Sequence, residues 1–222
     1  CLLMWIGEQI TANGVGNGIS LIIFAGIVAA LPKNLGTIYS YLQAGTISYF
    51  NAFVFAAIAL LMIVFVIYIQ EGNRRVPISY AKRVVGKKTY GGNSSHIPLK
   101  VNHAGVIPII FASSVLMFPV TIAQFVDIPW VKTVAGYFAW GTPLQTSIYA
   151  LLIIFFTYFY VAITFDPVEI SDNMRKYGGF IPGIRAGKPT ENYLSYVLSR
   201  LTAPGSLYLA LISLIPTLAI VL

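Results

Sequence analysis

The chain has 222 residues, of which 57% are hydrophobic and only 9% are charged, and its formal net charge is +7. Soluble domains carry roughly 25% charged residues, so this composition, with its apolar residues in long blocks, excludes a soluble domain and predicts an all-α polytopic membrane protein. The single cysteine, Cys1, excludes an internal disulfide. Because both ends lie in apolar runs and the first residue is not Met, we interpret residues 1–222 as a fragment of one membrane domain.

Apolar runs predict five membrane spans after a helix end at the start of the chain. The shortest run is bounded by Gly18 and Pro32, and its 13 residues reach about 20 Å of a hydrocarbon core about 30 Å thick. Either polar loop residues extend this helix, or it borders a funnel where the apolar layer is thin. The helix end covers residues 1–10, and the predicted spans cover residues 19–31, 49–70, 104–126, 147–165 and 201–222.

The third predicted span is built unlike a simple anchor. It contains Pro108, Pro119, Ser113 and Ser114 but no charged residue. Proline removes a backbone donor and bends a helix, and irregular backbone at membrane depth is tolerated only against protein or a water-filled cavity. We therefore expect this helix to face a cavity.

The distribution of Lys and Arg predicts the orientation of the spans. Of the 14 basic residues, seven lie in residues 71–103 and five in residues 166–200. The positive-inside rule makes these two loops cytosolic. Residues 32–48 and 127–146 are then extracytosolic loops, and the short apolar stretch 131–140 in the second of them is expected to lie along the membrane interface.

Turn signals in the two basic loops suggest a surface with a fixed shape. In the first loop, residues 76–80 and the stretch around Tyr90 are predicted to form a small β-hairpin. In the second, glycine and proline flank Arg185 and hold it outward. Contact with lipid headgroups or a merely solvated face are alternatives, but we favour docking of a cytosolic partner. The candidate docking residues are Arg74, Arg75, Lys82, Arg83, Lys87, Lys88 and Arg185.

Patterns for chemistry are weak in this sequence. The predicted spans from Ile19 onward contain no Asp, Glu, Lys, Arg or His, whereas ion-coupled transporters normally keep ionisable residues at membrane depth. His96 and His103 have no Cys, Asp or Glu beside them, and Ser113–Ser114 has no base partner. We predict neither an enzyme nor a metal site, and we expect no cofactor.

Isoleucines at helical spacing form a candidate constriction. Ile19 and Ile23 are four residues apart, and Ile107 and Ile110 are three apart, so each pair shares a helix face. Bulky apolar side chains that converge from several helices would block water and ions. Ordinary helix–helix packing explains the same spacing.

Five stretches of the sequence resemble the SecY family, the channel subunit of the bacterial protein translocase. They are GEQIT, GVGNGIS, NRRVPISYAKR, SSHIPLKVNHAGVIPIIFASS and GGFIPGIRAGKPT. The likeness covers essentially the whole chain. It implies a partial helix bundle, from the end of the fourth through the ninth helix of a ten-helix channel, with a small cytosolic β-hairpin.

The resemblance also implies a function and partners. The expected protein is the pore-forming subunit of the general secretory translocase in the bacterial cytoplasmic membrane, passing unfolded preproteins across the membrane and membrane proteins into it. The basic loops resemble the docking surface for the SecA motor ATPase and the ribosome. Implied partners are also the SecE and SecG subunits, preprotein signal sequences and membrane lipid.

By the same likeness, single residues acquire expected roles. Ser113, Ser114 and Phe118 fall on the gate helix, where signal sequences are selected. Ile19, Ile23, Ile107 and Ile110 fall at or next to the pore ring. The likeness further implies that the first half of the channel, with the plug and the second and third helices, and also the tenth helix are absent, so we expect this stretch alone neither to gate nor to close a ring. A neutral-solute transporter and a structural membrane scaffold remain alternatives to the channel.

Overall fold

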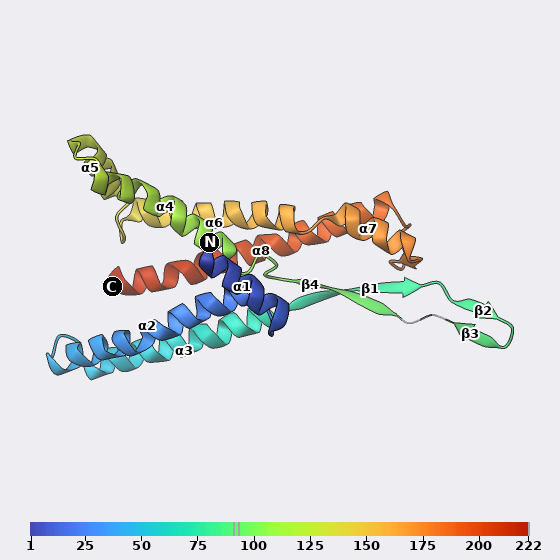
Figure 1. The fold of residues 1–222 in the computed structure, drawn as a ribbon, viewed down its shortest axis with the longest axis horizontal. Coiled ribbons are helices and arrows are strands. Elements are labelled where there is room, and N and C mark those ends of the chain that lie inside the picture. The colour runs from blue at the N-terminus through green and yellow to red at the C-terminus, as the bar shows by residue number, and fades with distance from the viewer. Residues whose placement is uncertain (91, 93, 222) are drawn as a thin grey trace. The chain divides into compact units, whose positions relative to one another are not determined.

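The computed structural model describes residues 1–90, 92 and 94–221, and it divides into two compact units, residues 1–61 and 62–222. Three helices begin in the first unit: α1 (Leu2–Asn13), α2 (Gly18–Gln43) and α3 (Tyr49–Glu71), whose last turns belong to the second unit. Figure 1 shows the course of the chain through these elements. Among the residues described, five helices are long and apolar enough to cross a membrane.

In the first unit, α1 packs against the start of α2. A Cβ atom on Gly18 would lie 2.0 Å from the Gly7 carbonyl oxygen, so the approach of the two helices requires glycine at this position. The Asn17 side chain caps α2 by accepting a hydrogen bond from the backbone N–H of Ile19 at 3.0 Å. The Thr11 hydroxyl accepts one from the backbone N–H of Gly18 at 2.9 Å.

The predicted helix bounds were wrong at two places in this unit. The helix expected to end at residue 10 continues to Asn13, and the span expected over residues 19–31 continues through Pro32 to Gln43. A proline removes one backbone hydrogen bond but does not prevent the following residues from remaining helical. The resulting 26 residues are about 39 Å long, which is enough to cross a bilayer. Residues that we had expected in the following loop therefore extend this helix, which is the first of the two explanations for its short apolar run.

In the second unit, α6 (Pro143–Thr164) packs against both α4 (Ile107–Phe125) and α8 (Lys188–Val221). Side chains from all three helices form one apolar cluster. Its buried members are Ala112 and Leu116 of α4, Tyr149 and Ile153 of α6, and Tyr208, Leu209 and Ala210 of α8. The short helix α5 (Pro129–Tyr137) follows α4 and occupies most of the stretch predicted to lie along the membrane interface.

The other end of this unit carries a small sheet on a second apolar cluster. Strand β1 (Asn73–Tyr80) lies between β4 (Ser95–Lys100) and β5 (Gly179–Phe180), antiparallel to both. Val76, Ile78 and Leu99 of the sheet are buried against residues of α6, α7 (Pro167–Lys176) and α8. Strands β2 (Arg83–Val85) and β3 (Lys88–Tyr90) form a separate two-stranded tip.

The structure corrects two predictions for the basic loops. A hairpin is present, but β1 begins at Asn73 and pairs with β4, whereas the stretch at Tyr90 pairs with Arg83. The loop predicted over residues 166–200 contains α7 and the first turns of α8, which begins at Lys188 and not at residue 201. Leu194, Val197 and Leu198 are buried at helical spacing, so packing on the sheet stabilises a helix in this charged segment. The other span ends differ from their predicted bounds by up to four residues.

Candidate functional site

Helix α4 has a packed face and an open face. Pro108, Ala112 and Leu116 are buried at four-residue spacing on the packed face. Ile110, Ser114 and Phe118 have the same spacing and are exposed, Ile110 by 44% and Phe118 by 68%. This exposed row of uncharged side chains points away from the bundle of α4, α6 and α8, so it is a surface that can contact another apolar segment.

The four predicted ring isoleucines lie in both units of the structure. Ile19 and Ile23 are about half exposed on one face of α2 in the first unit. In the second unit, Ile110 is on the open face of α4, but Ile107 is half-buried beside the Phe111 and Phe156 side chains. Ile107 and Ile110 therefore differ in environment, although their spacing placed both on one face.

Sequence analysis missed Val106, which directly precedes α4 in line with the open face of that helix. Val106 is 62% exposed, and its carbonyl oxygen accepts a hydrogen bond from the backbone N–H of Ile110 at 3.2 Å. This is the i, i+4 relation of a helix turn, so Val106 and Ile110 lie above one another. The four-residue spacing was visible in the sequence, but we had assigned the face by the isoleucines alone.

The two adjacent serines of α4 have different surroundings. Ser114 is exposed, and its hydroxyl donates to the backbone carbonyl of Ile110 at 2.8 Å. Ser113 is half-buried, donates to the carbonyl of Ile109 at 2.8 Å, and its Oγ lies 3.2 Å from the Tyr149 hydroxyl of α6. The structure thus associates Ser114 with the open face together with Phe118, and Ser113 with the contact between α4 and α6.

A polar segment joins the sheet to the start of α4. The Asn102 amide nitrogen donates to the Gln70 Oε1 atom at 3.0 Å, and the backbone N–H of Val101 donates to the Gly72 carbonyl at 3.2 Å. A Cβ atom on Gly205 of α8 would lie 2.4 Å from the Val101 carbonyl oxygen. The segment therefore fits tightly against α8, and a larger residue at 205 would displace it.

His103, the next residue of this segment, packs its ring edge-on against Phe165 at 5.4 Å between centroids. Burial, and secondarily the positive charge of Lys100, lower the pKa of His103 below its ordinary value of 6.5. Its Nδ1 atom is buried and has no hydrogen-bond partner among the residues that the structure describes. His103 is therefore a neutral member of the packed base of the sheet at neutral pH.

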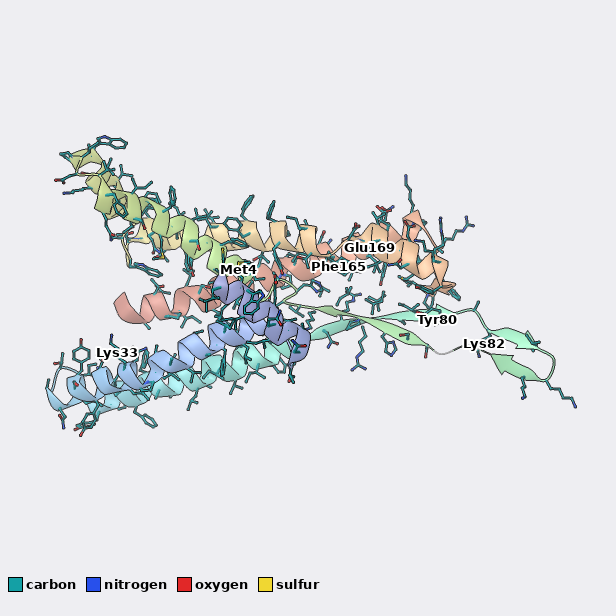
Figure 2. All side chains as sticks on the ribbon, in the orientation of Figure 1. Met4, Lys33, Tyr80, Lys82, Phe165 and Glu169 are labelled. Atoms are coloured by element: carbon teal, nitrogen blue, oxygen red, sulfur yellow. The ribbon has the colours of Figure 1, made fainter. Side chains whose placement is uncertain are left out.

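The first basic surface is the hairpin made by β1 to β4, and Figure 2 shows Lys82 beyond Tyr80 on the way to its tip. Arg74 and Arg75 on β1, together with Lys82, Lys87 and Lys88, are exposed, whereas the side chain of Arg83 lies outside the described part of the structure. Val84 and Val85 at the tip are each 67% exposed. The tip thus combines cations with an uncovered apolar pair.

The second basic surface is the loop around Arg185, and it is fixed to the core on both sides. Ile181 is 4% exposed within the apolar cluster under the sheet, and Ile184 packs against the same cluster. The buried Thr190 hydroxyl donates to the Arg185 carbonyl at 2.8 Å, and the Ser171 hydroxyl donates to the Gly187 carbonyl at 2.9 Å. The Arg185 side chain itself is exposed. Its cation is therefore carried by a backbone that Ile181, Thr190 and Ser171 hold in place.

In the part of the chain that the structure describes, no group of three or more His, Cys, Asp or Glu side chains lies close enough together to bind a metal ion.

The fold defines the class of protein. A structure from work on how the plug domain of the SecY protein stabilises the closed translocation channel has a TM-score of 0.65 and 19% identity, covering 98% of this chain and 56% of its own. A structure reported as that of a protein-conducting channel has a TM-score of 0.63 and 19% identity, with the same coverage. This chain is accordingly a multi-spanning membrane protein with the helical fold of such channels.

The sequence comparisons define the family. A family model described as SecY matches residues 1–222, and the chain belongs to the SecY family. The protein translocase subunit SecY of Streptomyces galbus is 50% identical over 226 residues, covering 100% of this chain and 51% of the relative. The same subunit of Mycobacterium leprae is 50% identical over 229 residues, covering 98% and 50%.

The chain spans about half the length of the curated relatives that it matches. Family membership and five apolar spans in the described residues make it a multi-pass protein of the bacterial cytoplasmic membrane.

Proposed function

We propose that this chain is part of the pore-forming subunit of the general secretory translocase, which passes unfolded preproteins across the membrane and membrane proteins into it. Its relatives are named protein translocase subunits. The observation that carries the proposal is the open face of α4, where Ile110, Ser114 and Phe118 form an uncharged row beside a packed bundle.

The chemistry of this row suits a passage for many sequences. An apolar, uncharged lining excludes ions by dewetting and offers no fixed charge that would hold back a segment of opposite sign. In the complete protein, Ile19, Ile23 and Ile110, with Val106 or Ile107 beside them, are proposed to contribute to a ring that closes around the passing chain. Ser114 and Phe118 are proposed to contact the signal sequence.

The sheet end is proposed to face the cytosol, because the two loops that contribute to it hold most of the Lys and Arg residues. There the hairpin cations and Arg185 would dock a motor ATPase or the ribosome. Exposed cations suit both acidic protein surfaces and the phosphates of ribosomal RNA. In this proposal the partner hydrolyses the nucleotide, and the SecE and SecG subunits complete the channel.

Charge reversal at Arg185 tests the proposal. The complete translocase carrying Arg185→Glu would be reconstituted in liposomes with the motor, ATP and a secretory preprotein. We expect entry of the preprotein into the lumen to fall at least tenfold, because a fixed cation that pairs with a carboxylate is replaced by a repelling charge. The matched control is Lys176→Glu, an equal charge change on the exposed end of α7. Equal entry with Arg185→Glu and with the control would contradict the docking role.

A second measurement tests the lining. Ile110→Asn in the complete channel should raise the ion conductance of the resting membrane, because a polar side chain in the constriction favours water. Ile110→Leu keeps the volume and apolar character and is the control. If the asparagine variant conducts no more than the leucine variant, Ile110 does not line the seal.

A further inference from the structure

A chain of two hydrogen bonds connects α4 to α6 within the bundle. The Ser113 hydroxyl donates to the Ile109 carbonyl at 2.8 Å, and its Oγ lies 3.2 Å from the Tyr149 hydroxyl oxygen. Since the serine has only one hydrogen and gives it to the carbonyl, the Tyr149 hydroxyl must be the donor to Ser113 Oγ. In the described residues, this is the one hydrogen bond that joins side chains of two different spanning helices.

Burial makes this bond specific. Tyr149 is 6% exposed, and its ring lies edge-on to Trp140 at 6.4 Å between centroids. A largely buried tyrosine hydroxyl that loses its partner must find another one, so separation of α4 from α6 has a cost at this point.

The packing on either side of Tyr149 is incomplete. One cavity of about 190 Å³ lies between Tyr149, Ser113 and Leu116, and another of about 430 Å³ lies between Tyr149, Ile109 and Pro216. Side chains that border a cavity have lost part of their dispersion contacts. Ala112 and Leu116 of α4 remain buried against α6 and α8. The hydroxyl pair adds a directional attachment to this apolar contact at the place where the packing is least complete.

We propose that Tyr149 is a positioning residue of the gate: its hydroxyl holds α4 against α6 through Ser113 and raises the free energy needed to move α4 aside for a signal sequence. This inference rests on the proposed function, in which a signal sequence contacts Ser114 and Phe118, and it adds that α4 moves to admit that sequence. Tyr149 itself does not touch the passing chain. It lies on the packed side of α4, whereas Ser114 and Phe118 lie on the open side.

The expected effect is a loss of selectivity. A hydrogen bond between membrane helices is worth about a threefold change in an equilibrium on average, and up to about twentyfold. Tyr149→Phe removes only the tyrosine hydroxyl. Ser113→Ala removes the oxygen that accepts from it, together with the serine's own hydrogen bond to the Ile109 carbonyl. Each should raise the entry of a preprotein with a weakened signal sequence, relative to the same preprotein with its normal signal, about threefold.

The experiment measures this ratio in liposomes that contain the complete translocase, motor and ATP. The variants are Tyr149→Phe, Ser113→Ala and the double variant, which should give no larger ratio than either single variant because all three break the same bond. Tyr158→Phe and Ser147→Ala are matched controls on α6; both residues are exposed, and Ser147 bonds only within its own helix. A merely structural role would change total entry but not the ratio.

Each outcome decides the inference. Suppose that both single variants leave the entry ratio unchanged while Arg185→Glu still reduces entry. The positioning role of Tyr149 would then be refuted, and the channel proposal would stand. Additive ratios in the double variant would show that the two side chains act separately, which also refutes the positioning role. If no preprotein enters under any condition, the channel proposal fails, and the positioning role of Tyr149 fails with it.

Discussion

The two basic regions of the second unit carry the same kind of charge on very different supports. At the hairpin tip, β2 and β3 form a two-stranded sheet with each other, and Val84 and Val85 are exposed. The loop around Arg185 is instead tied down by Ile181 in the core and by the Thr190 and Ser171 hydroxyls. The tip offers several interchangeable cations, whereas the loop offers one cation at a fixed place.

This difference predicts different roles in docking. Exposed lysines attract a partner over a distance, and that attraction is screened by salt and shared among several residues. An arginine on a fixed backbone can meet a carboxylate with defined geometry, which gives specificity and slow release. The hairpin is thus suited to capture a partner and the Arg185 loop to orient it.

The largest effect should follow from removing the apolar support of the loop. Ile181→Ala deletes a side chain that is 4% exposed and should lower the free energy of unfolding by about 2–5 kcal/mol. Val84→Ala at the exposed tip should change it by less than about 0.5 kcal/mol. Thermal unfolding of the complete protein in detergent measures both, and similar values would mean that the two regions do not differ in support.

A smaller effect should follow from removing one hydroxyl. Thr190→Val keeps the shape of a buried side chain but loses the hydrogen bond to the Arg185 carbonyl, which contributes about 1 kcal/mol. Preprotein entry should fall although no charge has changed. Thr89→Val on the exposed strand β3 is the control. Normal entry with Thr190→Val would show that the backbone at Arg185 need not be fixed.

At the tip we expect a kinetic and salt-dependent effect. Lys87→Ala combined with Lys88→Ala should slow association of the motor severalfold at about 50 mM salt and hardly at about 300 mM, because salt screens exposed charges. Arg185→Ala should instead speed dissociation. Stopped-flow binding at both salt concentrations separates the two rates, and a salt-independent loss at the tip would contradict its role in capture.

The smallest effect should be a pH dependence at the base of the sheet. Because the pKa of His103 is lowered in the folded state, the unfolded state binds a proton at a higher pH than the folded state does. The free energy of unfolding is therefore unaffected by this residue above pH 6.5 and decreases as the pH falls from 6.5 toward the lowered pKa. His103→Gln should remove this loss, whereas His96→Gln, at an exposed position of strand β4, should keep it. Thermal unfolding at pH 7.5 and at lower pH values provides the measurement.

Sequence patterns predicted the uninterrupted span best. Residues 49–70 were expected and α3 covers Tyr49–Glu71, because a continuous apolar run without a breaker leaves no alternative. Pro32 misled the prediction for α2, since proline ends helices often but not always. Leu194, Val197 and Leu198 already had helical spacing, but the charges around them hid the start of α8.

The sequence did not predict which strands pair or which helices contact each other. Alternation in residues 76–80 predicts a strand, but the pairing of β1 with β4 depends on the burial of Val76 and Leu99 against distant helices. In α4, successive residues are rotated by about 100°, so Ser113 and Ser114 had to face different ways. Only the position of α6 decides which serine meets Tyr149.

Strand β1 has a consequence for how the protein is made. It pairs with β4 nearby in the chain and with β5, where Ser79 lies opposite Phe180, about 100 residues later. At about 5–20 residues per second, a ribosome needs about 5–20 s to reach β5, and α4 and α6 are synthesised in that interval. The hairpin and the Arg185 loop can therefore come together only after α4 and α6 have been synthesised, so an incomplete chain cannot yet present both basic surfaces to a partner.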